Sequence, residues 1–132
     1  MPATVYTCGH STRSFSELVE LLRRNGVTLL VDVRAIPRSR FYPHFNKSYL
    51  EERLPVRYLW REELDGKNAK TVPQEAFDAG IDELISLSEK DVVCIMCSER
   101  SPTPTTSRPE GCHRWNRIAP ALIAKGAKVV HV

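Results

Sequence analysis

Four short segments of this 132-residue chain carry side chains that can do chemistry. Cysteine thiols can act as nucleophiles, imidazoles and carboxylates can carry protons, and guanidinium groups bind anions. No segment is a complete site alone, so a shared activity depends on a fold that brings them together. The segments are Cys8-Gly9-His10-Ser11, Asp32-Val33-Arg34, Cys97-Ser98-Glu99-Arg100 and Cys112-His113-Arg114.

The last two segments contain the candidate catalytic residues. Cys112 stands at the expected start of a helix beside His113 and an arginine, a setting that lowers the pKa of a thiol. Cys97 ends an apolar strand, and the long, proline-rich segment after it fits a phosphatase or sulfurtransferase loop only loosely. One interpretation makes Cys97 or Cys112 the nucleophile and Glu99 or His113 the proton carrier. The other leaves both cysteines as thiols without chemistry and pairs Glu99 with a neighbouring arginine.

The same residue types also bind metals. A site formed by Cys97, Cys112 and His113 is an alternative, although zinc sites usually combine two close pairs of ligands and this set contains one. The Cys94-x-x-Cys97 spacing does not supply a second pair, because residues i and i+3 of a strand face opposite sides. We therefore interpret Cys94 as a core residue. The sequence does not identify a cofactor.

Asp32 and Arg34 are two residues apart on an expected strand, so their side chains face the same side. They form either a structural ion pair or a site in which Arg34 binds an anion such as a phosphate. No acidic residue occurs from 33 to 50, whereas this stretch carries several cations, Arg38 among them. Aromatic residues alternate with these cations, so segment 34–47 is either a hydrophobic cover on a loop or an alternative nucleic-acid-binding surface.

Hydrophobic patterning predicts strands that alternate with helices. Continuous apolar runs are typical of strands buried on both faces of a sheet. Pro120 removes a backbone hydrogen bond inside the last helix and is expected to kink or shorten it. The expected strands are 5–7, 27–33, 56–60, 91–97 and 128–132, and the expected helices run from Ser14 or Ser16 to Asn25, over 48–54, over 76–87, and from Cys112 to Gly126. The expected loops are 35–46, 61–73 with a turn at Asp65-Gly66, and 98–111.

This alternation predicts an α/β fold, a three-layer sandwich whose mostly parallel central sheet is covered by helices on both faces. The whole chain, residues 1–132, is expected to form one domain. Ligands of such sheets bind outside the carboxyl ends of the strands. Because the chemically active segments follow strands or open the last helix, we expect them to meet at this one edge.

The amino-acid composition and charge exclude several classes of protein. Hydrophobic residues make up 42% of the chain and charged residues 27%, a mixture that excludes a disordered or fibrous chain. The net charge of +3 is too small to indicate nucleic-acid binding by itself. No apolar run approaches the ~18 residues of a membrane span, and the first residues do not read as a signal peptide. We therefore expect a cytoplasmic protein with no membrane partner and four unbridged cysteines.

Several motifs together resemble those of a known family. They are Thr7-Cys8-Gly9-His10-Ser11, Val31-Asp32-Val33-Arg34 with Pro37-Arg38-Ser39, Phe45-Asn46-Lys47, Met96-Cys97-Ser98-Glu99, Cys112-His113-Arg114 and His131-Val132. The family that they resemble is DUF488, a domain of unknown function. The resemblance implies a compact three-layer α/β domain but no established reaction. The residues that it marks are His10, Ser11, Asp32, Arg34, Cys97, Glu99, Cys112, His113 and Arg114.

These observations predict an enzyme or binding protein with a cationic, cysteine-containing pocket. Its expected partner is an anionic small molecule, nucleotide-like or phosphorylated. The expected catalytic residues are Cys97, Glu99, Cys112 and His113, and the expected ligand-binding residues are His10, Ser11, Asp32, Arg34, Arg38 and Arg114. The sequence gives neither the substrate nor the reaction nor the number of subunits.

Overall fold

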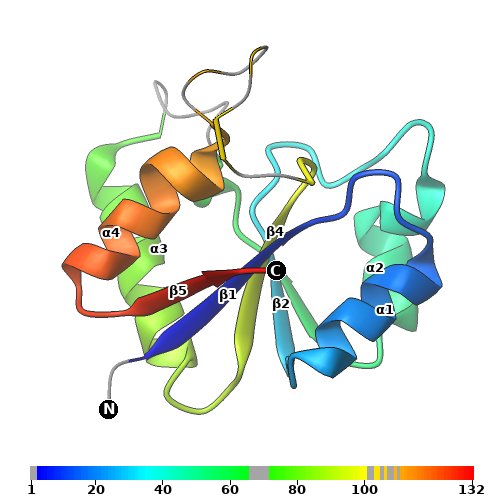
Figure 1. The fold of residues 1–132 in the computed structure, drawn as a ribbon, viewed down its shortest axis with the longest axis horizontal. Helices are drawn as coiled ribbons and strands as arrows, with labels where there is room; N and C mark the ends of the chain where they lie inside the picture. The colour runs from blue at the N-terminus through cyan, green and yellow to red at the C-terminus, as the bar shows by residue number, and fades with distance from the viewer. Residues whose placement is uncertain (1–2, 66–71, 101–102, 105, 107–108, 110) are drawn as a thin grey trace.

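Five parallel strands form one sheet in the order β3-β2-β4-β1-β5 (Figure 1). The computed structural model describes residues 3–65, 72–100, 103–104, 106, 109 and 111–132. The strands are β1 (Thr4–Gly9), β2 (Leu29–Asp32), β3 (Arg57–Trp60), β4 (Val93–Cys97) and β5 (Lys128–His131). Every observed strand pair is parallel, so the expected α/β class is confirmed and the carboxyl ends of all five strands share one edge.

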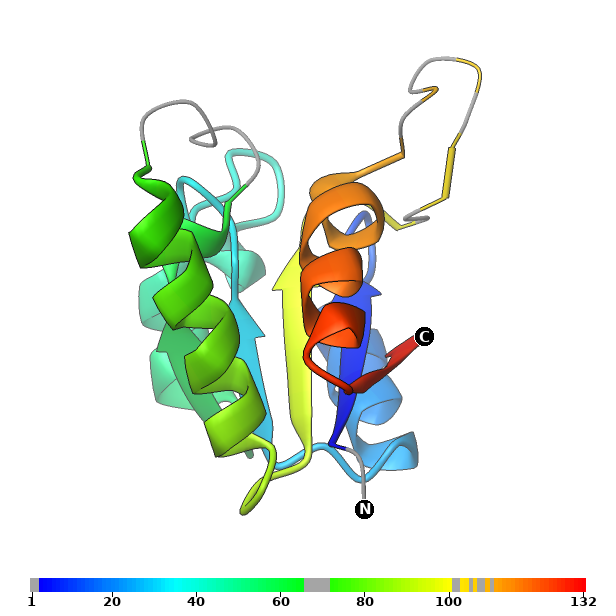
Figure 2. The same cartoon turned by 90° about the vertical axis from the view of Figure 1, so that its left-hand side faces the viewer.

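Helices cover both faces of the sheet (Figures 1 and 2). Helices α1 (Phe15–Arg24) and α2 (Lys47–Arg53) pack on one face, and α3 (Gln74–Leu87) and α4 (Ala119–Ala124) pack on the other. Each face has its own apolar core, because successive side chains of a strand point to opposite sides. No helix among the described residues is both long enough and apolar enough to cross a membrane.

Strand β4 separates the two cysteines of the Cys-x-x-Cys spacing. Cys97 lies in the core beneath α3 and α4, whereas Cys94 lies in the core beneath α1 and α2. Both sulfurs belong to the same continuous strand, which has no turn that would bring them together. The sequence-based rejection of a Cys-x-x-Cys motif is therefore confirmed.

Local sequence explains where α1 begins and ends. The Ser14 hydroxyl accepts a hydrogen bond from the backbone of Glu17, and the Glu17 carboxylate accepts one from the backbone of Ser14. This reciprocal capping satisfies two backbone donors at the helix start. At the other end Gly26 adopts a φ of 67°, a conformation that favours glycine. The helix and its caps thus match the sequence-based expectation.

The last helix differs from the expected single α-helix that opens at Cys112. A five-residue π-helical turn, η3 (Arg114–Ile118), precedes α4. Pro120 lacks the backbone N–H that a regular helix would use, and π-helical turns accommodate such a local irregularity. The predicted disturbance by Pro120 is present, and it takes the form of this turn.

Two short 3₁₀ turns lie in segments expected to be loops. They are η1 (Pro43–Phe45) and η2 (Glu62–Leu64). Gly66 of the expected Asp65-Gly66 turn and six of the fourteen residues of the loop expected at 98–111 fall outside the described residues. The other expected helices and strands are present with boundaries shifted by a few residues.

Candidate functional site

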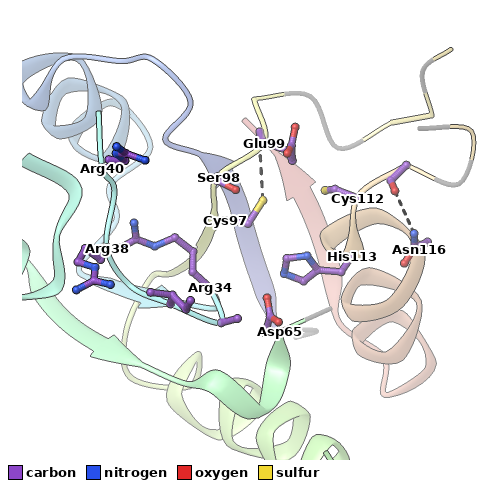
Figure 3. Close-up of a pocket in the computed structure, with 13 residues that line it drawn as sticks. Arg34, Arg38, Arg40, Asp65, Cys97, Ser98, Glu99, Cys112, His113 and Asn116 are labelled. Atoms are coloured by element: carbon purple, nitrogen blue, oxygen red, sulfur yellow. Dashed lines mark hydrogen bonds between the residues drawn. The ribbon is translucent and has the colours of Figure 1, made fainter. Parts of the chain in front are cut away.

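A pocket of about 590 Å³ opens at the carboxyl edge of the sheet (Figure 3). Pockets of this size are typical of sites for small molecules. Three separated stretches form most of its wall: the segment after β2, the end of β4 with the segment after it, and the start of the last helix. The lining residues are Arg34, Ala35, Ile36, Arg38, Arg40, Asp65, Cys97, Ser98, Glu99, Gly111, Cys112, His113 and Asn116.

Arg34 forms a buried ion pair with Asp32. Its Nε donates to Oδ1 of Asp32 at 2.9 Å and its Nη2 to Oδ2 at 2.6 Å. The hydroxyl of Tyr58 donates to the same carboxylate, and burial beside this carboxylate raises the pKa of Tyr58 above its usual range. Nη2 also donates to the Phe45 carbonyl. The structural interpretation of the pair is therefore correct, and the pair also fixes the guanidinium of Arg34 in the pocket wall.

Arg114 is fully buried behind the pocket rather than in its wall. Its Nε donates to Sγ of Cys97 at 2.9 Å and its Nη1 to the Thr7 hydroxyl at 2.6 Å. Its Nη2 donates to the carbonyl oxygen of Glu99 at 2.7 Å. No carboxylate of the described residues forms an ion pair with it. A buried cation without a counter-ion is strongly unfavourable, so a negative charge on the neighbouring sulfurs would stabilise Arg114.

Cys97 and Cys112 form the thiol pair at the floor of the pocket, where Sγ of Cys97 donates to the carbonyl oxygen of Glu99 at 3.8 Å (Figure 3). Each residue is only 2% exposed, and both line the cavity. Interaction with the neighbouring Cys97 thiol lowers the pKa of Cys112 to about 5 against the opposing effect of burial. The Arg114 charge and the backbone N–H groups of Trp115 and Arg114 act in the same direction. Interaction with Cys112, together with burial, raises the pKa of Cys97. At neutral pH the pair therefore holds one proton and one negative charge.

The other two cysteines are fully buried on the opposite face of the sheet. Cys8 and Cys94 belong to the core beneath α1 and α2 and do not line the pocket. The interpretation of Cys94 as a core residue is confirmed, and the same placement applies to Cys8. Two of the four free thiols are thus separated from the site by the sheet.

The network around Arg114 continues to the last strand. The Thr7 hydroxyl accepts a hydrogen bond from Arg114 and can therefore donate its own proton to Nδ1 of His131, 2.5 Å away. This arrangement requires an unprotonated Nδ1. Burial and the nearby Arg114 charge lower the pKa of His131 and favour this neutral state. His131 thus has a satisfied hydrogen bond at the edge of the core.

His10 and Ser11 support the pocket without lining it. The His10 ring stacks on Phe45 with their centroids 4.4 Å apart, and its Nδ1 contacts the Ser11 carbonyl oxygen at 3.0 Å. The backbone N–H of Ser11 donates to the carbonyl of Ser98. A Cβ at Gly9 would lie 1.6 Å from the carbonyl oxygen of Glu99, so only glycine fits at this position. This opening motif therefore supports the backbone that follows β4.

The structure brings six of the ten expected site residues into the pocket wall. They are Arg34, Arg38, Cys97, Glu99, Cys112 and His113, whereas His10, Ser11, Asp32 and Arg114 lie behind or beside it. Figure 3 shows His113 extending from the helix toward the middle of the pocket. Arg40, Asp65, Ser98 and Asn116 also line the wall and were not among the expected residues. Of these, Arg40 belongs to the acid-free cationic stretch and Ser98 to the segment Cys97-Ser98-Glu99-Arg100, whereas the sequence did not mark Asp65 or Asn116 as site residues.

Metal ligation finds no support in the described residues. No group of three or more histidine, cysteine or acidic side chains within them is arranged to hold a metal ion. The alternative site at Cys97, Cys112 and His113 is therefore not proposed.

Comparison with known proteins supports the family resemblance. Residues 14–72 match the family described as Domain of unknown function DUF488. This match confirms the resemblance to DUF488. The DUF488 match includes Asp32, Arg34 and Arg38, whereas the thiol pair lies outside it. Neither a curated protein nor a solved structure matches the chain.

Proposed function

We propose that this protein is a cytoplasmic, thiol-dependent enzyme that acts on an anionic small molecule. Cys112 is its nucleophile, and the ligand is a phosphorylated or nucleotide-like compound bound against the arginines of the pocket. A cytoplasmic location is consistent with four free cysteines, because thiols persist in a reducing compartment.

The observation that carries this proposal is the contact between a buried guanidinium and the thiol pair. Arg114 has no carboxylate partner among the described residues, and its Nε lies 2.9 Å from Sγ of Cys97. A thiolate on the pair supplies the missing counter-charge, and a thiolate is the nucleophilic form of cysteine. The charge that stabilises the buried arginine is thus the same charge that makes Cys112 reactive.

Recognition of an anion is supported by the charge on the pocket wall. Arg38 and Arg40 lie on one side of the pocket, opposite the thiols, whereas the charge of Arg34 in the same wall is balanced by Asp32 (Figure 3). Guanidinium groups suit phosphate and carboxylate because their planar donors can bind two oxygens at once. Glu99 and His113 line the same cavity, so either can carry a proton to or from the reacting group.

Paired alkylating reagents test the nucleophile and the anion site together. Iodoacetate is anionic and iodoacetamide is neutral, and both alkylate a thiolate. We expect the ratio of the iodoacetate rate to the iodoacetamide rate to be several-fold higher at Cys112 than at free cysteine, because the arginines attract the anion. Arg38→Ala should reduce this ratio. Arg24→Ala removes the same charge from the exposed end of α1 and should leave it unchanged. A ratio equal to that of free cysteine would refute the anion site, and failure of both reagents to modify Cys112 would refute the nucleophile.

A second candidate function is single-stranded nucleic-acid binding by segment 34–47. Phe41 and Ile36 are 80% and 65% exposed, and the guanidinium of Arg40 lies 5.8 Å from the Phe41 ring centroid. Exposed aromatics beside cations can stack on bases and contact phosphates. Affinity for an oligonucleotide should fall steeply with salt and weaken in Phe41→Ala. Absence of binding at low salt would exclude this function.

A further inference from the structure

In a reaction that needs only one nucleophile, the second thiol lowers the pKa of Cys112 but does not itself react. We propose that Cys97 is the resolving thiol for Cys112 and that the site reduces small hydroperoxides. The catalytic cycle would then pass through a Cys97–Cys112 disulfide. This inference rests on the proposed function, because Cys112 must first act as the nucleophile.

The placement of the two sulfurs favours such a role. Cys97 ends β4 and Cys112 precedes η3, so residues far apart in the sequence meet at one pocket (Figure 3). Both thiols line the same cavity, and they are close enough for each to shift the pKa of the other, so the two sulfurs can meet within one site. Cysteines that react with oxidants are typically found beside such a second thiol.

Access to the sulfurs indicates a small oxidant. Each cysteine is only 2% exposed, and its exposed part opens into the pocket. A hydroperoxide presents a terminal oxygen that can reach a nearly enclosed sulfur. A bulky disulfide must instead bring a sulfur with two substituents into line with the attacking thiolate. The geometry therefore favours hydroperoxides over disulfides as substrates.

Arg114 favours return of the pair to its reduced form. The reduced pair supplies the negative charge opposite this buried cation, and disulfide formation removes that charge. Stabilising the reduced form makes a disulfide easier to reduce, which is typical of catalytic rather than structural disulfides. The pair is thus suited to repeated oxidation and reduction.

The reaction proceeds in two balanced steps. The Cys112 thiolate attacks the terminal oxygen of ROOH, so the S–O bond forms, the O–O bond breaks and RO⁻ leaves to take a proton from water. The sulfur loses two electrons and becomes a sulfenic acid, while the peroxide is reduced to an alcohol. Cys97 then attacks the sulfenic sulfur, the S–S bond forms, and the hydroxyl leaves with the Cys97 proton as water. An external thiol reduces the disulfide and completes the cycle.

Oxidation of the full-length protein with one equivalent of hydrogen peroxide tests whether Cys97 is the resolving thiol. The wild-type protein has four free thiols and should retain two after oxidation, with a mass loss of two hydrogen atoms and a Cys97–Cys112 cross-linked peptide. Cys97→Ser should stop at a Cys112 sulfenic acid, which dimedone traps. Cys112→Ser should form no cross-link. Cys94→Ala changes the same strand on its opposite face and should behave as the wild type. Circular dichroism establishes that each variant is folded, and Cys97→Ala provides a second substitution if Cys97→Ser is not.

Distinct results separate this inference from the proposed function. If wild-type Cys112 is trapped by dimedone as strongly as in Cys97→Ser and no cross-link forms, the resolving role is refuted while the nucleophile stands. Faster oxidation by oxidised glutathione than by hydrogen peroxide would overturn the assignment of hydroperoxides. If Cys112 reacts neither with peroxide nor with the alkylating reagents, the proposed function itself fails.

Discussion

The pH dependence of Cys112 alkylation is the sharpest test of a thiolate at this site. With a pKa of about 5, Cys112 is about 90% thiolate at pH 6, whereas free cysteine with a pKa of about 8.5 is about 0.3% thiolate. This gives Cys112 a roughly 300-fold advantage in thiolate fraction. Intrinsic nucleophilicity falls with pKa, which removes roughly 40-fold over a difference of about 3.5 pKa units. Cys112 should therefore react about eightfold faster than free cysteine at pH 6.

The advantage reverses in alkaline solution. At pH 8.5 about half of free cysteine is thiolate, so Cys112 gains only about twofold in thiolate fraction and should react roughly 20-fold more slowly. Limited access to the buried sulfur lowers both Cys112 rates by a common factor. The decisive quantity is therefore the change with pH, which is only about 1.1-fold for Cys112 but about 150-fold for free cysteine between pH 6 and pH 8.5.

The assay uses neutral iodoacetamide, so that the charge of the pocket does not affect the reagent. The modified Cys112 peptide is quantified by mass spectrometry at each pH, with N-acetylcysteine in the same tube as the reference. Cys97→Ala removes the neighbouring thiol that lowers the pKa of Cys112 and should shift the profile to higher pH, whereas Cys94→Ala should not. A Cys112 rate that rises with pH as steeply as the reference would refute the thiolate and the role assigned to Arg114.

Four further predictions concern Arg114, the thiol pair, the Tyr58 hydroxyl and Gly9. Arg114→Met should raise the pKa of Cys112 and slow its alkylation at pH 6, as measured by the iodoacetamide assay. The free energy of unfolding should rise with pH between about 5 and 8.5, because the folded pair binds fewer protons than the unfolded thiols. The contribution of the pair to the slope approaches about 1.4 kcal/mol per pH unit and should be lost in Cys112→Ala, as measured by urea titration of both proteins. Tyr58→Phe should cost about 1–3 kcal/mol in the same titration, because the buried carboxylate of Asp32 loses a donor. Gly9→Ala should lower the melting temperature, with a cost at or above the upper end of about 1–3 kcal/mol, because its Cβ would overlap the backbone of the segment after β4.

The strands could be predicted from local sequence because their burial leaves a local pattern. Segments 27–33 and 91–97 are nearly continuous apolar runs, and β2 and β4 are buried on both faces between other strands. A strand between two helical layers cannot carry a polar face, so the pattern alone identifies it. The α1 caps are equally local, because Ser14 and Glu17 are three residues apart.

The contacts of the site could not be predicted in the same way. The sequence placed Arg114 among the residues that would bind a ligand, whereas the structure places it behind Cys97, against Thr7. This placement depends on the strand order, in which β4 lies beside β1 and the last helix covers both. The spacing of residues along the chain does not reveal which of them are neighbours in the fold. The sequence therefore predicted the sheet edge at which the candidate site lies, but not which side chains contact each other there.

The presence of arginine at position 114 is itself informative. A structural role in a core is often served as well or better by an apolar side chain of similar volume, because desolvating a guanidinium costs several kcal/mol. The hydrogen bonds from Arg114 to Thr7 and to the Glu99 carbonyl could offset only part of that cost. What an apolar side chain cannot supply is a positive charge beside two thiols. Stability and reactivity are therefore linked at this position, and Arg114→Met should leave a folded protein in which the pKa of Cys112 is higher than in the wild type.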